Sequence, residues 1–135
     1  MASDSLAGLS PDAVIEAFHA ALNCDRELSR VVYRVTLSVE RGMVSLDDLR
    51  IRSEYQNKGY GSRVLALLTD LCDANGSTIK VVPAPPESDA YCRVSVTRSD
   101  LIQWYEDACF RRSTKYVWIR KPRTLPGSRL YASRR

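Results

Sequence analysis

A glycine-rich turn between a strand-like run and a helix-like run constrains the fold of this chain more than any other feature. The turn covers residues 56–62, Gln-Asn-Lys-Gly-Tyr-Gly-Ser. Apolar residues then recur at helical spacing over 64–72, and Asn75-Gly76 supplies a helix C-cap. In such a strand–loop–helix unit, the backbone N–H groups that open the helix converge on one point, where a pyrophosphate can bind. The sequence predicts a phosphate-binding turn, and a plain glycine-rich helix cap is the alternative.

The remaining segments alternate between helical and strand-like periodicity. Ser10-Pro11 is typical of a helix start, because serine caps a helix and proline fits its first position. Apolar and polar residues alternate over 31–40, and a turn signal follows at Arg41-Gly42. We expect, in chain order, a helix over 11–23, strands over 31–40 and 43–51, the helix after the turn, a strand over 79–82, a helix from Thr97 or Ser99, and a strand over 116–119. This order predicts an α+β (mixed α/β) fold in one domain.

Composition and cysteine spacing narrow the class of protein. With 135 residues, 44% apolar and 27% charged, the chain has room for one core. Its longest apolar run, 64–68, is too short to span a membrane, and residues 1–10 lack the pattern of an export signal. We therefore expect a cytoplasmic protein with no membrane partner. The four cysteines show no zinc-ligand spacing, so we expect no metal site. We expect the cysteines to be scattered buried thiols, at Cys24, Cys72, Cys92 and Cys109.

Basic residues are concentrated at the carboxy-terminal end. The formal net charge is +4, yet residues 1–110 carry 11 basic residues against 16 acidic ones, whereas residues 111–135 carry nine basic residues and no acidic one. Such a segment can bind a nucleic acid, a phosphorylated cofactor or an acidic partner subunit. A solvated strand face followed by a loose basic tail is the alternative, and the sequence leaves both open.

Two motifs together resemble the GNAT acetyltransferase superfamily. The turn 56–61, Gln-x-x-Gly-x-Gly between a strand and a helix, is similar to the coenzyme A signature of that superfamily. Residues 104–110, Trp-Tyr-Glu-Asp-Ala-Cys-Phe, are similar to its late helix, and 120–122, Arg-Lys-Pro, to its usual ending. The resemblance covers about residues 31–122. Cys109 departs from the pattern, because the superfamily prefers glycine there, and the part before the hairpin is abbreviated.

The resemblance implies a compact GNAT-like fold, in which a central twisted mixed sheet flanked by helices is split beside acetyl-CoA. It implies an N-acyltransferase that moves an acetyl group from acetyl-CoA to an amine acceptor by direct attack in a ternary complex. Leu49, Arg50 and Ile51 would then pair with the pantetheine arm, although an ordinary strand is the alternative. The pyrophosphate would lie on the turn, whose implied cofactor-binding residues are Gln56, Asn57, Lys58, Gly59, Tyr60, Gly61 and Ser62.

Tyr105 is the residue to which the resemblance gives a catalytic role. Leu101, Trp104, Tyr105 and Ala108 stand at i, i+3, i+4 and i+7 and share one helix face. A phenol with an ordinary pKa of about 10 is protonated at neutral pH, so Tyr105 suits a general acid that protonates the departing thiolate of CoA. A core aromatic with a satisfied hydroxyl is the alternative. The sequence assigns no general base and does not identify the amine acceptor.

These arguments lead to one GNAT-like domain over residues 1–122 and a basic tail over 123–135. The leading hypothesis is an acetyl-CoA-dependent N-acetyltransferase. The rival is a catalytically silent binding module of the same fold, which uses its basic tail to bind nucleic acid or an acidic partner. Dimers are common among the proteins it resembles, so a homodimer stays open. The connection 83–98 is a candidate flap beside the acceptor, with a surface loop as the alternative.

Overall fold

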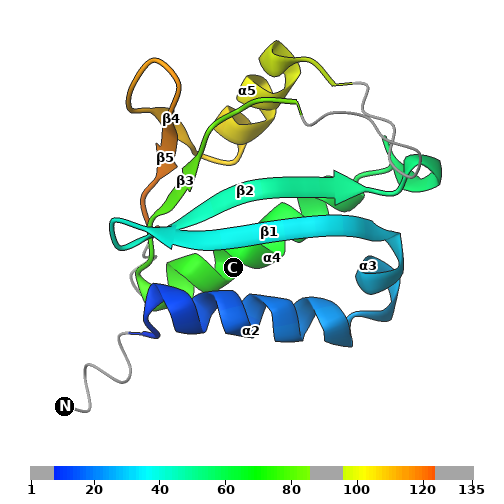
Figure 1. Cartoon of the computed structure of the whole chain (residues 1–135), viewed down its shortest axis with the longest axis horizontal. Coiled ribbons are helices and arrows are strands. Elements are labelled where there is room, and N and C mark those ends of the chain that lie inside the picture. Colours follow the sequence, from blue (N-terminus) through cyan, green and yellow to red (C-terminus); the bar gives the residue numbers. More distant parts are fainter. Residues whose placement is uncertain (1–7, 86–95, 124–135) are drawn as a thin grey trace, which may run out of the picture.

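The computed structural model describes residues 8–85 and 96–123 (Figure 1). Cys92, most of the candidate flap and nearly all of the basic tail lie outside these residues. In the described part, five strands form one mixed sheet in the order β1-β2-β3-β5-β4. The elements in chain order are α2 (Pro11–Cys24), α3 (Arg26–Val31), β1 (Val32–Glu40), β2 (Met43–Ile51), the 3-10 helix η1 (Ser53–Tyr55), α4 (Tyr60–Asn75), β3 (Ile79–Val81), α5 (Arg98–Asp107), β4 (Arg111–Arg112) and β5 (Trp118–Arg120). The predicted α+β class, with a central mixed sheet flanked by helices, is confirmed.

β1 and β2 form the predicted hairpin, and the second strand contains a β-bulge. Leu37 pairs with Leu46 and Thr36 pairs with Asp48, so Asp47 is the extra residue of the bulge. Bulges bend a strand and increase its twist, and they occur often beside active sites. The bulge therefore marks the point on β2 from which the strand changes its course.

β2 and β3 diverge at this same point. The two strands run parallel in register only over residues 44–46 of β2 and Ile79–Val81 of β3. β3 then ends, whereas β2 continues to Ile51 (Figure 1). The sheet is thus split beside the carboxyl end of β3.

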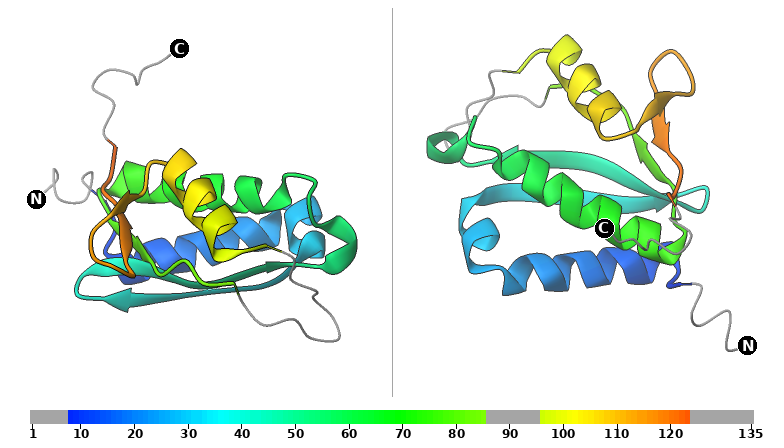
Figure 2. Two further views of the ribbon diagram at one scale, coloured as in Figure 1. Left: turned by 90° about the horizontal axis from the view of Figure 1, so that it is seen from above. Right: turned by 180° about the vertical axis from the view of Figure 1, so that it is seen from behind.

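The longer helices lie on one side of the sheet (Figure 2). α2 and α4 lie side by side there, and the core forms between them and the sheet. Phe18 of α2, Leu68 of α4, Ile79 of β3 and Phe110 after α5 are among its largest fully buried side chains. In the described residues, no helix has the length and apolar character needed to cross a membrane.

A buried ion pair joins β5 to α4. Arg120 is 6% exposed, and its Nη1 lies 2.6 Å from Oδ1 of Asp73. Its Nε donates to the carbonyl of Ala108 at 2.9 Å, and the backbone N–H of Arg123 donates to the same aspartate at 2.9 Å. Because a buried guanidinium is costly without partners, these bonds hold the end of the sheet against α4.

The structure corrects the expected boundaries in two places. A short helix, α3, precedes β1, because the Asp25 side chain accepts the N–H of Leu28 at 2.9 Å and caps a new helical turn. The last strand is Trp118–Arg120 rather than 116–119, and it pairs with β4, a strand of two residues that the sequence did not predict.

The expectation of buried thiols is also corrected. Cys72 is buried as predicted, and burial raises its pKa to about 12. Cys24, however, is exposed, because it is the last residue of α2 and lies beyond the buried position Leu22. Cys109 is only partly buried, in a left-handed turn with φ 77° after α5.

Candidate functional site

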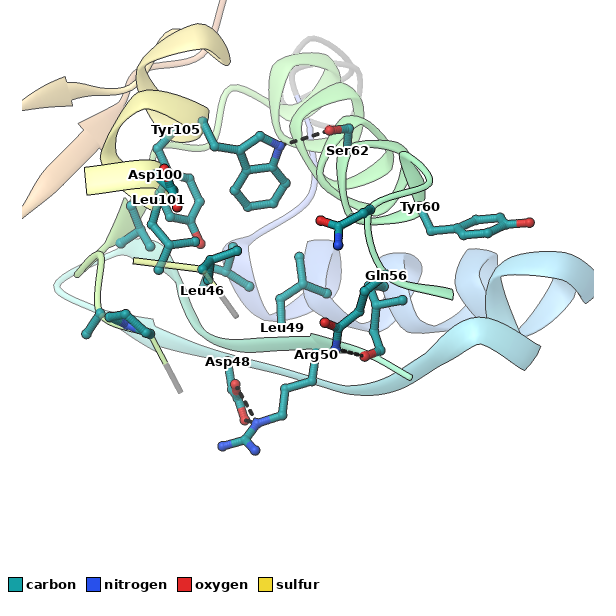
Figure 3. Close-up of a pocket in the computed structure, with 18 of the residues that line it drawn as sticks. Leu46, Asp48, Leu49, Arg50, Gln56, Tyr60, Ser62, Asp100, Leu101 and Tyr105 are labelled. Carbon is teal, nitrogen blue, oxygen red and sulfur yellow. Dashed lines mark hydrogen bonds and ion pairs between the residues drawn. The ribbon is translucent and has the colours of Figure 1, made fainter. Parts of the chain in front are cut away.

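A cleft of about 700 Å³ opens where β2 and β3 diverge (Figure 3). Residues 46–51 of β2 form one wall, residues 59–62 at the start of α4 form another, and α5 contributes Leu101, Trp104 and Tyr105. Ten of the eleven site residues predicted from the sequence line this cleft, and Lys58 is the exception. The fold therefore brings the predicted strand, the glycine-rich turn and the tyrosine to one place.

The turn ends in a helix start that no side chain caps. Gly59 is the N-cap of α4 and has φ 86°, in the left-handed region that favours glycine. Among the described residues, nothing lies within 4 Å of a Cβ placed there, so conformation rather than space requires the glycine. The first bond of the helix ladder runs from the N–H of Arg63 to the carbonyl of Gly59 at 3.1 Å. The amides of residues 60–62 precede it and face the position where an anion binds best.

Two cations lie beside the turn, Lys58 within it and Arg63 directly after it. The Arg63 Nη1 lies 2.7 Å from Oε1 of Glu27 on α3, and the hydroxyl of Tyr60 donates to Oε2 of Glu27 at 2.8 Å. These bonds, from Arg63 first and then Tyr60, lower the pKa of Glu27. Arg63 is thus committed to Glu27, whereas Lys58 is exposed and has no ion pair among the described residues. Glu27 carries no sequence signal for this role, because it lies 33 residues before Tyr60.

Trp104 connects α5 to the turn. Its indole N–H donates to Oγ of Ser62 at 2.9 Å, as Figure 3 shows. A Cβ on Gly61 would lie 3.7 Å from the Trp104 ring, which is an ordinary contact. On the other side, Nε2 of Gln56 donates to the carbonyl of Ile51 at 2.8 Å and folds the turn back onto β2. Both walls of the cleft are therefore fixed by direct bonds to the turn.

Tyr105 has a buried ring and a hydroxyl without a protein partner. The ring is 6% exposed and packs against Trp104 and Phe110, with centroid distances of 4.9 and 5.2 Å. In the described part of the chain, its hydroxyl makes no hydrogen bond, although it reaches toward β2 at the cleft (Figure 3). Burial, and to a smaller extent the charge of Asp48, raises the pKa of Tyr105 above its ordinary value. The phenol is therefore a neutral proton donor over the physiological pH range.

The acidic residues of the cleft are already held by other groups. Asp47 accepts bonds from Ser38 at 2.6 Å and Ser45 at 2.7 Å. Asp48 lies 3.1 Å from Nε of Arg50, and Asp100 closes the capping box of α5. Each of the three carboxylates of the cleft therefore already has a hydrogen-bond or ion-pair partner. Within residues 8–85 and 96–123, no group of histidine, cysteine and acidic side chains is arranged to hold a metal ion.

Comparisons with known proteins bear on the fold. No family model matches the chain, and no curated protein matches it. Among solved structures, the crystal structure of anti-CRISPR protein AcrVA5 is similar, with a TM-score of 0.51 and 20% sequence identity, over 67% of this chain and 90% of that chain. At this identity the likeness concerns the fold alone. The mixed five-stranded sheet with its helices is consistent with a GNAT-like fold.

Proposed function

We propose that this protein is an N-acyltransferase that transfers an acetyl group from acetyl-CoA to an amine acceptor. One observation carries the proposal: a single cleft contains both the start of α4, which no side chain caps, and the buried hydroxyl of Tyr105. That hydroxyl has no hydrogen-bond partner among the described residues. The GNAT-like fold and the two motifs that resemble that superfamily support it.

The walls of the cleft fit the parts of acetyl-CoA. The pyrophosphate suits the amides of residues 60–62, because the helix dipole and the uncapped N–H groups favour an anion there. Lys58 adds a peripheral positive charge beside the turn. The pantetheine arm carries amides, and it suits the stretch of β2 that continues past the end of β3, where a peptide-like chain can align with the strand. Leu49 supplies apolar surface to that wall.

The chemistry requires a proton for the leaving sulfur. Acetyl-CoA supplies a thioester whose carbonyl carbon a neutral amine attacks, so that a C–N bond forms and the C–S bond breaks. Tyr105 gives its hydroxyl proton to the departing sulfur and regains one from solvent. Because the pKa of Tyr105 is raised, the hydroxyl is protonated before each turnover. The acceptor ammonium loses its own proton to water before the attack.

Calorimetric titration tests the binding half without any known acceptor. The purified protein is titrated with acetyl-CoA, desulfo-CoA, ATP and inorganic pyrophosphate. We expect micromolar binding of the CoA compounds alone. Equal binding of every polyphosphate would mean a general anion site, and no binding at all would remove the cofactor assignment. Where CoA binds, an acceptor screen by thiol release follows, with peptides, small amines and aminoacylated tRNA side by side.

A glutamate at position 61 tests where the cofactor lies. Gly61→Glu places a carboxylate among the amides that open α4, and we expect acetyl-CoA affinity to fall by more than about tenfold, or 1.4 kcal/mol. The fold should persist, because a Cβ at this position makes only ordinary contacts. Ala66→Glu is the matched control, since Ala66 is an exposed position further along the same helix. Equal affinity of Gly61→Glu and Ala66→Glu would place the cofactor elsewhere.

A further inference from the structure

A positively charged surface lies beside the cleft but takes no part in it. We call it the hairpin surface after the β4–β5 hairpin. It consists of β4, the β4–β5 turn and the first residue of α5. Its five residues are exposed and none of them lines the cleft: Arg98, Arg111, Arg112, Lys115 and Tyr116. Within residues 8–85 and 96–123, none of its four cations forms an ion pair. The described residues therefore provide no ion-pair partner for these four cations.

The residues of the hairpin surface form a contiguous group around Trp118. The guanidinium carbon of Arg98 lies 5.6 Å from the centroid of the Trp118 ring, and that of Arg112 lies 5.7 Å from it. Arg98 also donates to the backbone carbonyl of Lys115 at 3.4 Å. The Lys115 Nζ lies 5.4 Å from the centroid of Tyr116. Two guanidinium groups on one indole hold their charges in a fixed arrangement rather than on freely moving side chains.

Two details indicate the kind of ligand. Glu106 contacts the same indole and accepts its N–H at 3.0 Å, but among the described residues it forms no ion pair with Arg98 or Arg112. Tyr116 leaves 59% of its surface exposed although it is a large aromatic side chain. Fixed guanidinium groups beside an exposed aromatic ring match the two parts of a nucleotide strand, its phosphates and its bases.

We propose that the hairpin surface binds single-stranded nucleic acid. The arginines and Lys115 neutralise successive phosphates, and Tyr116 stacks on a base. An acidic polypeptide would meet the cations but would leave the exposed ring without a role. The proposal is independent of the acyl-CoA assignment, since the two surfaces share no residue.

Fluorescence anisotropy of the full chain tests this proposal. The probe is a fluorescein-labelled oligouridine RNA of about 16 nucleotides, with the matching oligothymidine DNA as a second probe. We expect binding that weakens as KCl is raised, and the slope of log K against log salt should become shallower by about 0.7 for each phosphate that is no longer neutralised. Arg98→Gln with Arg112→Gln should reduce the slope by about 1.4. Tyr116→Ala should weaken binding roughly tenfold, whereas Tyr116→Phe should retain it.

The control removes equal charge from a distant element. Arg26 and Arg30 are exposed on α3, at the opposite end of the molecule from the hairpin surface on β4 and β5 (Figure 1). The double variant Arg26→Gln, Arg30→Gln should bind RNA like the wild type, and the Arg98, Arg112 variant should remain folded and keep its acetyl-CoA affinity. Equal loss in both double variants, an unchanged slope, or displacement of RNA by polyglutamate at the concentration of unlabelled RNA would overturn the proposal. The last result would assign the surface to an acidic protein instead.

Discussion

Replacing Tyr105 by phenylalanine separates a catalytic tyrosine from a structural one, because the two roles predict opposite signs for stability. The change removes one oxygen atom from a residue that is 6% exposed and keeps its ring contacts with Trp104 and Phe110. In the described part of the chain that oxygen has no hydrogen-bond partner, so its burial costs free energy. We expect Tyr105→Phe to raise the free energy of unfolding by about 1 kcal/mol, or roughly 3–5 °C in Tm for a chain of this size.

The same variant should lose activity. A positioned general acid contributes about 10²–10⁴-fold, so kcat should fall by at least about 10²-fold, with acetyl-CoA affinity unchanged. Turnover is followed as thiol release with the best amine of the acceptor screen, and stability by thermal unfolding. Tyr60→Phe is the matched control for stability, because the Tyr60 hydroxyl donates to Glu27 at 2.8 Å, and losing that bond should lower rather than raise the thermal midpoint.

The opposite pattern would refute the catalytic role. If Tyr105→Phe unfolds at a lower temperature and keeps full turnover, its hydroxyl serves the core and the general acid is another group. A variant that is more stable and equally active would show that the buried hydroxyl is unsatisfied but unused, and would also remove Tyr105 from the reaction.

Three further outcomes follow from the geometry. Gly59→Ala should lower the free energy of unfolding by about 1–2 kcal/mol, because φ of 86° is costly for alanine even where no atom is in the way; thermal unfolding measures it. Asp73→Asn leaves the buried guanidinium of Arg120 without its counter-ion, so the free energy of unfolding measured in urea should fall by about 3 kcal/mol. Asp70→Asn, on the same helix, should change it little, because burial raises the pKa of Asp70 and already disfavours its charged form. Above about pH 10, the free energy of unfolding should fall, since the pKa of Tyr105 is higher in the folded chain than in the unfolded one. In a pH series of unfolding curves, Tyr105→Phe should lose less of this free energy than the wild type.

The elements that the sequence predicted correctly have strong local signals. Ser10 caps α2 by accepting the N–H of Ala13 at 3.2 Å, and Thr97 with Asp100 forms a capping box at the start of α5. Gly76 ends α4 with φ 69° in the left-handed region. These interactions act within three or four residues, so the pattern of residue types is enough to predict them. The glycine-rich turn before α4, residues 56–62, was predicted from the same kind of local signal.

The features that were missed depend on partners far along the chain. β4 consists of two exposed arginines, and only its pairing with β5 makes it a strand. The bulge at Asp47 arises from the register between β1 and β2, which no single strand encodes. Arg63, which directly follows the predicted phosphate-binding turn, forms an ion pair with Glu27 on a helix that the sequence did not predict. Such partners are set by the tertiary fold, so local periodicity cannot assign them.

The role of Tyr105 depends on where β3 ends. Its spacing with Leu101, Trp104 and Ala108 indicates only a shared helix face, because residues that face a core and residues that line an apolar cleft follow the same helical spacing. The ring of Tyr105 packs in the core, whereas its hydroxyl lies at the cleft. If β3 continued past Val81 beside β2, its backbone carbonyls would occupy the cleft, and the hydroxyl could donate to one of them. Tyr105 would then be an ordinary core residue. The split between β2 and β3 therefore opens the cleft and, at the same time, leaves the Tyr105 hydroxyl without a hydrogen-bond partner among the described residues.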